Sequence, residues 1–154
     1  METLYANLFI NAWVTVLESF CTKQIIGTDI IPPKEAPNER DIYVFMGLIG
    51  DLNGQVFMSM DAETGKALAG EMLGGMEIGD ADELVTSAVG ELCNMIMGNA
   101  CSNISLTNLS VDITPPTVIS NMNLQQFNLK ASYSIAIHLE DLKEINFNVS
   151  VMAS

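Results

Sequence analysis

The stretch TSAVGELCNMIMGNA, residues 86–100, has the spacing of a long helix with one apolar and one polar face. At about 100° per residue, the apolar positions fall on one side, which we expect to be buried. These positions are Val85, Val89, Leu92, Ile96 and Ala100. The opposite side carries Ser87, Gly90, Glu91, Asn94 and Gly98. Because Glu91 and Asn94 are three positions apart, their side chains are neighbours on the helix surface.

Two glycines flank this polar pair. Glycine within a helix costs about 1 kcal/mol relative to alanine, so Gly90 and Gly98 need a physical explanation. Close approach of another surface would explain both, whereas a poorly stabilised, exposed helix is the simpler alternative. Asn99 lies to one side of the polar face, and we expect it to have a structural role.

The polar pair limits the chemistry of this helix. A nucleophilic triad needs a histidine, and the single histidine, His138, lies in an apolar strand pattern, where we expect an ordinary strand residue. Glutamate and asparagine alone also make a poor metal site. A carboxamide can orient a water molecule for in-line attack on phosphorus, because phosphoryl transfer depends mainly on positioning and electrostatics. The carboxylate can pair with a cation on a partner protein.

The sequence before this helix mixes helical and strand patterns. We expect an amphipathic helix at 3–20, a strand at 24–31, an exposed proline-rich connection at 32–40, a hairpin at 42–60 and a helix that follows Asp61 and extends through Leu73. The Asn53-Gly54 dipeptide predicts the hairpin turn. Asp61 is a candidate N-cap, and Gly74-Gly75 should end the helix that follows it. Asp80 and Asp82 mark the start of the long helix, which should reach at least Ala100.

The sequence after the long helix is rich in strand patterns. Thr114-Pro115-Pro116 interrupts the chain, and strands are expected at 117–120, 132–139 and 145–152. The last two alternate apolar and polar residues, so each should have one solvated or partner-facing side. Since few strands alternate with helices, we expect an α+β domain, a mostly antiparallel sheet with long helices packed on it.

Composition narrows the class of protein. The length of 154 residues and a hydrophobic content of 49% predict a single domain over residues 1–154. The net charge of −13 opposes binding to nucleic acid and to anionic membranes. No apolar run approaches the roughly 18 residues of a bilayer span, and the N-terminus lacks the features of a signal peptide. We therefore expect a cytoplasmic protein.

Cysteine usage agrees with that compartment. Cys21, Cys93 and Cys101 form no C-x-x-C pair, so a structural zinc site and a disulfide framework are both poorly supported. Reduced thiols in the cytosol are the simple interpretation. Cys93, beside Asn94, points partly toward the expected core and should be an inert buried thiol.

The long helix and its surroundings resemble the CheC, CheX and FliY family of chemotaxis phosphatases. The family signature of Asp or Ser, then Glu, then Asn, followed by a distant proline, is present as Ser87, Glu91, Asn94 and Pro115-Pro116. GLIGDLNGQVFMSMDAETGKALAGEMLGG before the helix and ITPPTVIS after it are also similar to CheX. The resemblance extends over residues 4–152, and the single copy of the motif is most like CheX.

This resemblance implies a CheC-like fold and hydrolysis of the phospho-aspartate of a CheY-type response regulator. Asn94 would orient the attacking water, and Glu91 would pair with a lysine of the regulator. Ser87 would lie at the edge of the contact, and Gly90 and Gly98 would face the partner. The Mg²⁺ would belong to the regulator, and this chain would bind no cofactor of its own.

The resemblance to CheX also implies a homodimer formed through paired sheets, for which the alternating C-terminal strands are candidates. Two function classes remain open. The first is the phosphatase, and the second is a non-catalytic CheX-like module that docks a response regulator or motility component. The intact pair of Glu91 and Asn94 favours the enzyme. A metalloenzyme is a distant third interpretation.

Overall fold

The computed structural model describes residues 5–37, 39–78, 82–123 and 131–153. Within these ranges the helices are α1 (Ala6–Phe20), α2 (Ala62–Met72) and α3 (Asp82–Ser105), with a short 3-10 helix, η1 (Pro33–Glu35). The strands are β1 (Ile25–Ile31), β2 (Glu39–Gly50), β3 (Leu52–Met60), β4 (Val111–Ile113), β5 (Thr117–Asn123), β6 (Tyr133–Leu139) and β7 (Ile145–Ala153). No helix of the described ranges is long and apolar enough to cross a bilayer.

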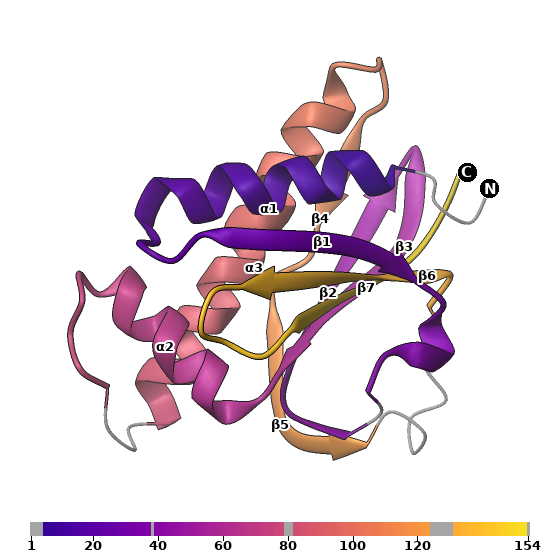
Figure 1. Ribbon diagram of the computed structural model, residues 1–154. Coiled ribbons are helices and arrows are strands. Elements are labelled where there is room, and N and C mark those ends of the chain that lie inside the picture. The colour runs from indigo at the N-terminus through magenta and orange to yellow at the C-terminus, as the bar shows by residue number, and fades with distance from the viewer. Residues whose placement is uncertain (1–4, 38, 79–81, 124–130, 154) are drawn as a thin grey trace.

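The described strands form one antiparallel sheet, as the sequence predicted. Their order is β1-β6-β7-β3-β2-β4, and β5 also pairs with β2. The helices lie together along one face of this sheet, and α3 runs between α1 and α2 (Figure 1). β6 and β7, the candidates for a paired sheet face or edge, are interior strands, so neither offers a free edge. β1 occupies that edge instead.

A single large core joins the helices to the sheet. Phe9 and Trp13, on the buried side of α1, place their rings 5.5 and 5.7 Å from the ring of Phe147 in β7. The sheet contributes alternate residues of its strands to the same cluster, among them Val44, Met46, Val56, Met58, Ile135 and Val149. The amphipathic helix predicted near the N-terminus is confirmed for its described part, since its apolar stripe lies in this core.

The prediction that Asn53-Gly54 forms the hairpin turn is wrong. β3 begins at Leu52, and Gly54 already pairs with Leu48 across the hairpin. Gly54 has φ of +155°, and a Cβ there would collide with the Ser150 carbonyl group of β7, so this glycine serves strand packing. The chain reverses before it, and the Asn53 side chain closes the turn by donating to the Gly50 carbonyl oxygen at 2.9 Å.

The signals at the helix ends are mostly confirmed. Asp61 caps α2 by accepting a hydrogen bond from the Thr64 backbone amide at 3.0 Å. Gly74 and Gly75 follow that helix with positive φ angles of 77° and 88°. α3 begins at Asp82 and ends at Ser105, while Asp80 lies outside the described residues. The connection predicted at 32–40 contains η1, and β2 begins within it at Glu39.

The second face of β6 and β7 is largely covered by the chain itself, which corrects the expectation of a solvated or partner-facing side. Ser134, Asn146 and Asn148 are at most 2% exposed. Asn148 donates to the Phe57 carbonyl oxygen at 3.1 Å, and the rings of Tyr43 and Phe57 form a second small core cluster. The alternation of apolar and polar residues therefore distinguishes the two faces of the sheet, but the chain covers both faces at these positions.

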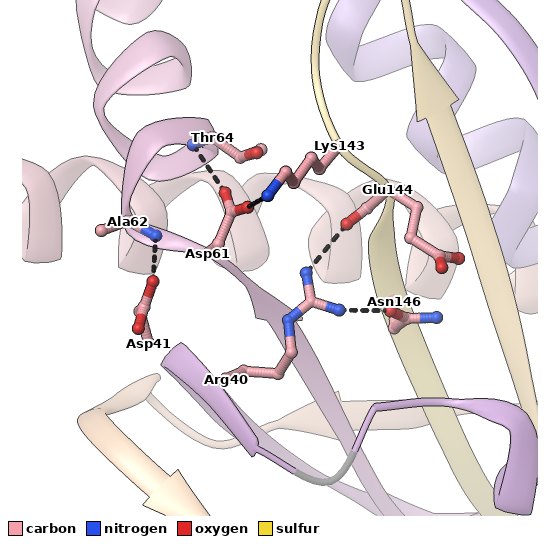
Figure 2. A network of polar contacts seen from close by, with 8 residues as sticks. All are labelled: Arg40, Asp41, Asp61, Ala62, Thr64, Lys143, Glu144 and Asn146. Atoms are coloured by element: carbon pink, nitrogen blue, oxygen red, sulfur yellow. Dashed lines mark hydrogen bonds and ion pairs between the residues drawn. The ribbon is translucent and has the colours of Figure 1, made fainter.

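A polar network joins β2, the turn between β6 and β7, and the start of α2. The Arg40 guanidinium donates to Asn146 Oδ1 at 2.7 Å and to the Glu144 carbonyl oxygen at 2.9 Å. Figure 2 shows this contact beside the Asp61 cap, whose carboxylate also lies 3.9 Å from Lys143 Nζ. The turn between β6 and β7 is thereby held against β2 and α2.

Candidate functional site

The polar face of α3 is positioned by the burial of its opposite face. The apolar residues predicted to be buried are all in the core: Val89, Leu92, Ile96 and Ala100 at 0% and Val85 at 6% exposure. α1 packs on α3 along one side, and α2 packs where Gly65 faces Val85. These contacts fix the rotation of the helix about its axis, so the face with Glu91 points outward.

Glu91 and Asn94 are both accessible from solvent. Glu91 is exposed, Asn94 is half-buried, and Ser87 is exposed one turn earlier. The side chains of Glu91 and Asn94 form no hydrogen bond or ion pair with other residues of the described chain. The carboxylate and the carboxamide therefore keep their full hydrogen-bonding capacity for a partner.

The two glycines of this face differ in surroundings. Gly90 is buried, and a Cβ there would lie 3.3 Å from Val118 Cγ2 and 3.9 Å from Pro116 Cγ. The surface that approaches Gly90 closely is thus this chain's own β5, which corrects the expectation that Gly90 faces a partner. A Cβ at Gly98 would meet nothing within 4 Å. The partner-facing role of Gly98 stays a prediction.

The segment Thr114-Pro115-Pro116 packs beside α3. β4 and β5 pair with successive parts of β2, and the break between them lies at Gly47. The Gly47 amide donates to Thr114 Oγ1 at 2.7 Å, and the Thr114 amide donates to the Gly47 carbonyl oxygen at 3.1 Å. This pairing places Pro116 beside Gly90, which gives the distant proline of the motif a structural role.

Three neighbouring predictions have clear outcomes. Cys93 is fully buried, and burial raises the pKa of its thiol to about 12, so it is unreactive. Asn99 accepts a hydrogen bond from Asn103 Nδ2 at 3.2 Å, in keeping with a structural role. His138 is a β6 residue whose Nε2 lies 3.1 Å from Asp29 of β1.

The site lies on the exposed face of a helix. Two clefts of about 670 and 600 Å³ lie around α2 and between α1 and β1, and neither is lined by Glu91 or Asn94. Within the described ranges, no three His, Cys, Asp or Glu side chains are grouped to hold a metal ion. A polar pair on the exposed face of a helix suits insertion into the pocket of another protein better than capture of a small molecule.

Comparison with known proteins agrees with this arrangement. Residues 42–140 match the protein family described as chemotaxis phosphatase CheX. The chain belongs to the CheX family. It is 33% identical over 112 residues to the CheY-P phosphatase CheX of Thermotoga maritima, and the match covers 71% of this chain and 72% of that protein.

Solved structures of a CheX protein and of a FliY protein share the fold. The CheX-CheY-BeF3-Mg²⁺ complex from Borrelia burgdorferi contains a chain that matches with a TM-score of 0.81 and 26% identity, over 96% of this chain and 97% of that one. Thermotoga maritima FliY matches with a TM-score of 0.66 and 20% identity, over 95% of this chain and 86% of that one. The predicted CheC-like α+β fold is confirmed.

Proposed function

We propose that this protein hydrolyses the phospho-aspartate of a CheY-type response regulator. The observation that carries the proposal is the accessible pair of Glu91 and Asn94 on the outward face of α3, in a chain of the CheX family. Its relatives support the partner, because one is named a CheY-P phosphatase and another was solved with CheY.

Asn94 orients the attacking water in this proposal. Its carboxamide enters the regulator's phosphorylation site and holds the water in line with the bond between phosphorus and the aspartate oxygen. A new phosphorus–oxygen bond forms as the old one breaks, and the products are the aspartate carboxylate and dihydrogen phosphate. The leaving carboxylate has a pKa of about 4, so it needs no proton, and positioning can supply most of the acceleration.

Glu91 holds the two proteins in register. Its exposed carboxylate, one turn before Asn94, pairs with a lysine of the regulator, and this ion pair directs the carboxamide toward phosphorus. The Mg²⁺ of the reaction belongs to the regulator in this proposal, and this chain contributes no metal ligand.

A direct assay tests the proposal. The cognate regulator is phosphorylated with acetyl phosphate in Mg²⁺, the excess reagent is removed, and phosphate loss is followed with and without this protein. The proposal expects catalytic amounts of the protein to accelerate phosphate release. Tight binding without any acceleration would instead assign the chain as a docking module.

We propose in addition that the protein is a cytoplasmic homodimer joined through β1. This edge strand carries Ile26 and Ile30 at 68% and 42% exposure, beside the cleft between α1 and β1. The three cysteines are free thiols, which suits a reducing compartment. Sedimentation should give a dimer for the wild type and a monomer for Ile30→Lys, and a monomeric wild type would reject the dimer.

A further inference from the structure

Leu84 lies on the same outward face of α3 as the polar pair. It precedes Glu91 by seven residues, nearly two full turns, which places the two side chains about 20° apart around the helix axis. Leu84 is 45% exposed in the folded chain, although it belongs to the first turns of a helix whose other large apolar residues are mostly buried. Leu84, Ser87 and Glu91 have the spacing i, i+3 and i+7, which places all three on one side of the helix.

Single exposed leucines are common on protein surfaces, so position must decide whether this one contacts a partner. A standard interface covers about 800 Å² on each protein, equivalent to a disc with a radius of about 16 Å. At 1.5 Å per residue, Leu84 lies about 13 Å along the helix from the midpoint between Glu91 and Asn94. A regulator centred on the polar pair would therefore cover Leu84.

Leu106 provides an internal comparison. It follows the last turn of α3 and is 82% exposed, more than Leu84. Leu106 lies about 20 Å from the same midpoint along the helix direction. This distance exceeds the radius of about 16 Å expected for the contact. Two exposed leucines thus bracket the polar pair, and only the nearer one falls within the expected contact.

We propose that Leu84 is an apolar docking anchor for the same phosphorylated response regulator, an inference that rests on the proposed function. The complementary surface on the regulator is an apolar patch next to the lysine that pairs with Glu91. Between Leu84 and Glu91, Ser87 is exposed and polar, whereas Ala88 is buried at 9% exposure, so Leu84 is the large apolar side chain exposed on this part of the face.

Leu84 acts on affinity and leaves the chemical step unchanged. It lies too far from Asn94 to touch the phosphoryl group, so its contact is equal in the ground state and the transition state. An interaction of this kind lowers KM and does not change kcat. A regulator without such an apolar patch should bind less tightly, so Leu84 also contributes to the choice of regulator.

The test compares Leu84→Ser, Leu84→Met and Leu106→Ser with the wild type, each with its thermal midpoint measured to confirm folding. kcat and KM are measured for phosphate release, and Kd is measured for the regulator activated with beryllofluoride and Mg²⁺. Leu84→Ser should raise KM and Kd about five- to tenfold, the loss expected for half of a leucine burial, with kcat unchanged. Leu84→Met should keep the wild-type values, and so should Leu106→Ser.

The outcomes separate the two proposals. Unchanged Kd in Leu84→Ser, or an equal loss in Leu106→Ser, would overturn the anchor while the phosphatase activity of the wild type stands. A lower kcat with an unchanged Kd would also overturn it, because Leu84 would then act on the chemistry. If the wild type releases no phosphate, the proposed function fails, and the Kd values alone decide whether Leu84 binds the regulator.

Discussion

Gly90 of α3 lies directly against Val118 of β5, where an added Cβ would be 3.3 Å from Val118 Cγ2. A contact this short leaves room for the glycine hydrogen and little more. The helix that carries the polar pair can therefore approach β5 closely, because Gly90 has no side chain at the contact.

Replacing Gly90 should destabilise the fold. Gly90→Leu forces a branched side chain against Val118 and Pro116, and overpacking of this kind costs about 2 kcal/mol, more than the gain in helix propensity. Chemical denaturation of the purified variant measures the change in the free energy of unfolding. A variant as stable as the wild type would contradict this prediction, because β5 would then move away from the larger side chain at little cost in free energy.

The same substitution at Gly98 should have the opposite effect on stability. A Cβ there meets nothing within 4 Å, so Gly98→Leu should stabilise the protein by about 0.8 kcal/mol through helix propensity. If a regulator docks on this face, the added side chain should also raise KM about tenfold or more. A more stable variant with unchanged KM would remove Gly98 from the partner surface.

The Asp61 cap should make stability depend on pH. Burial disfavours the charged carboxylate, but the hydrogen bonds from Thr64 and the charges of Lys143 and Arg40 outweigh it and hold the pKa of Asp61 below its usual value. A lowered folded-state pKa stabilises the protein above the unfolded pKa of about 4, and this contribution disappears as pH falls through the folded value.

Asp61→Ala should therefore cost about 1 kcal/mol at pH 7, and the difference from the wild type should shrink below about pH 4. Urea denaturation across this pH range measures both values. Asp61→Asn serves as the control, because it keeps a capping oxygen and loses the charge. A difference that stays constant with pH would mean that the carboxylate charge does not contribute.

Glu91 should act mainly on binding. Glu91→Ala should raise KM about tenfold, since an ion pair at the interface is lost, and the salt dependence of KM should weaken. Glu35→Ala removes an equal charge from exposed η1 and is the matched control. A defect in kcat alone, with KM unchanged, would rule out the lysine partner.

Sequence reasoning predicted the elements whose signals are local. The buried side of α3 follows from a sustained helical period, and the Asp61 cap follows from one side chain and the next turn. The class of fold and the outward positions of Glu91 and Asn94 came from the same local patterns.

The errors came from contacts between distant segments. Asn53-Gly54 has the sequence of a turn, but Gly54 is needed where the Ser150 backbone of β7 passes close by. Gly90 has the sequence of a partner-facing glycine, but Val118 fills the space beside it. Asn146 has the spacing of a solvated residue, but Arg40 reaches it from β2. None of these neighbours is close in sequence, so no local pattern could reveal them.

The most direct test of the account is the rate of phosphate loss from the regulator with Asn94→Ala and, as its control, Asn99→Ala. Both asparagines lie on α3, but the Asn99 side chain accepts a hydrogen bond from Asn103, whereas the Asn94 side chain forms none within the described chain. The account predicts that Asn94→Ala still binds the beryllofluoride-activated regulator and loses nearly all acceleration, while Asn99→Ala keeps it. Full activity in Asn94→Ala would contradict the water-positioning role at the centre of this account.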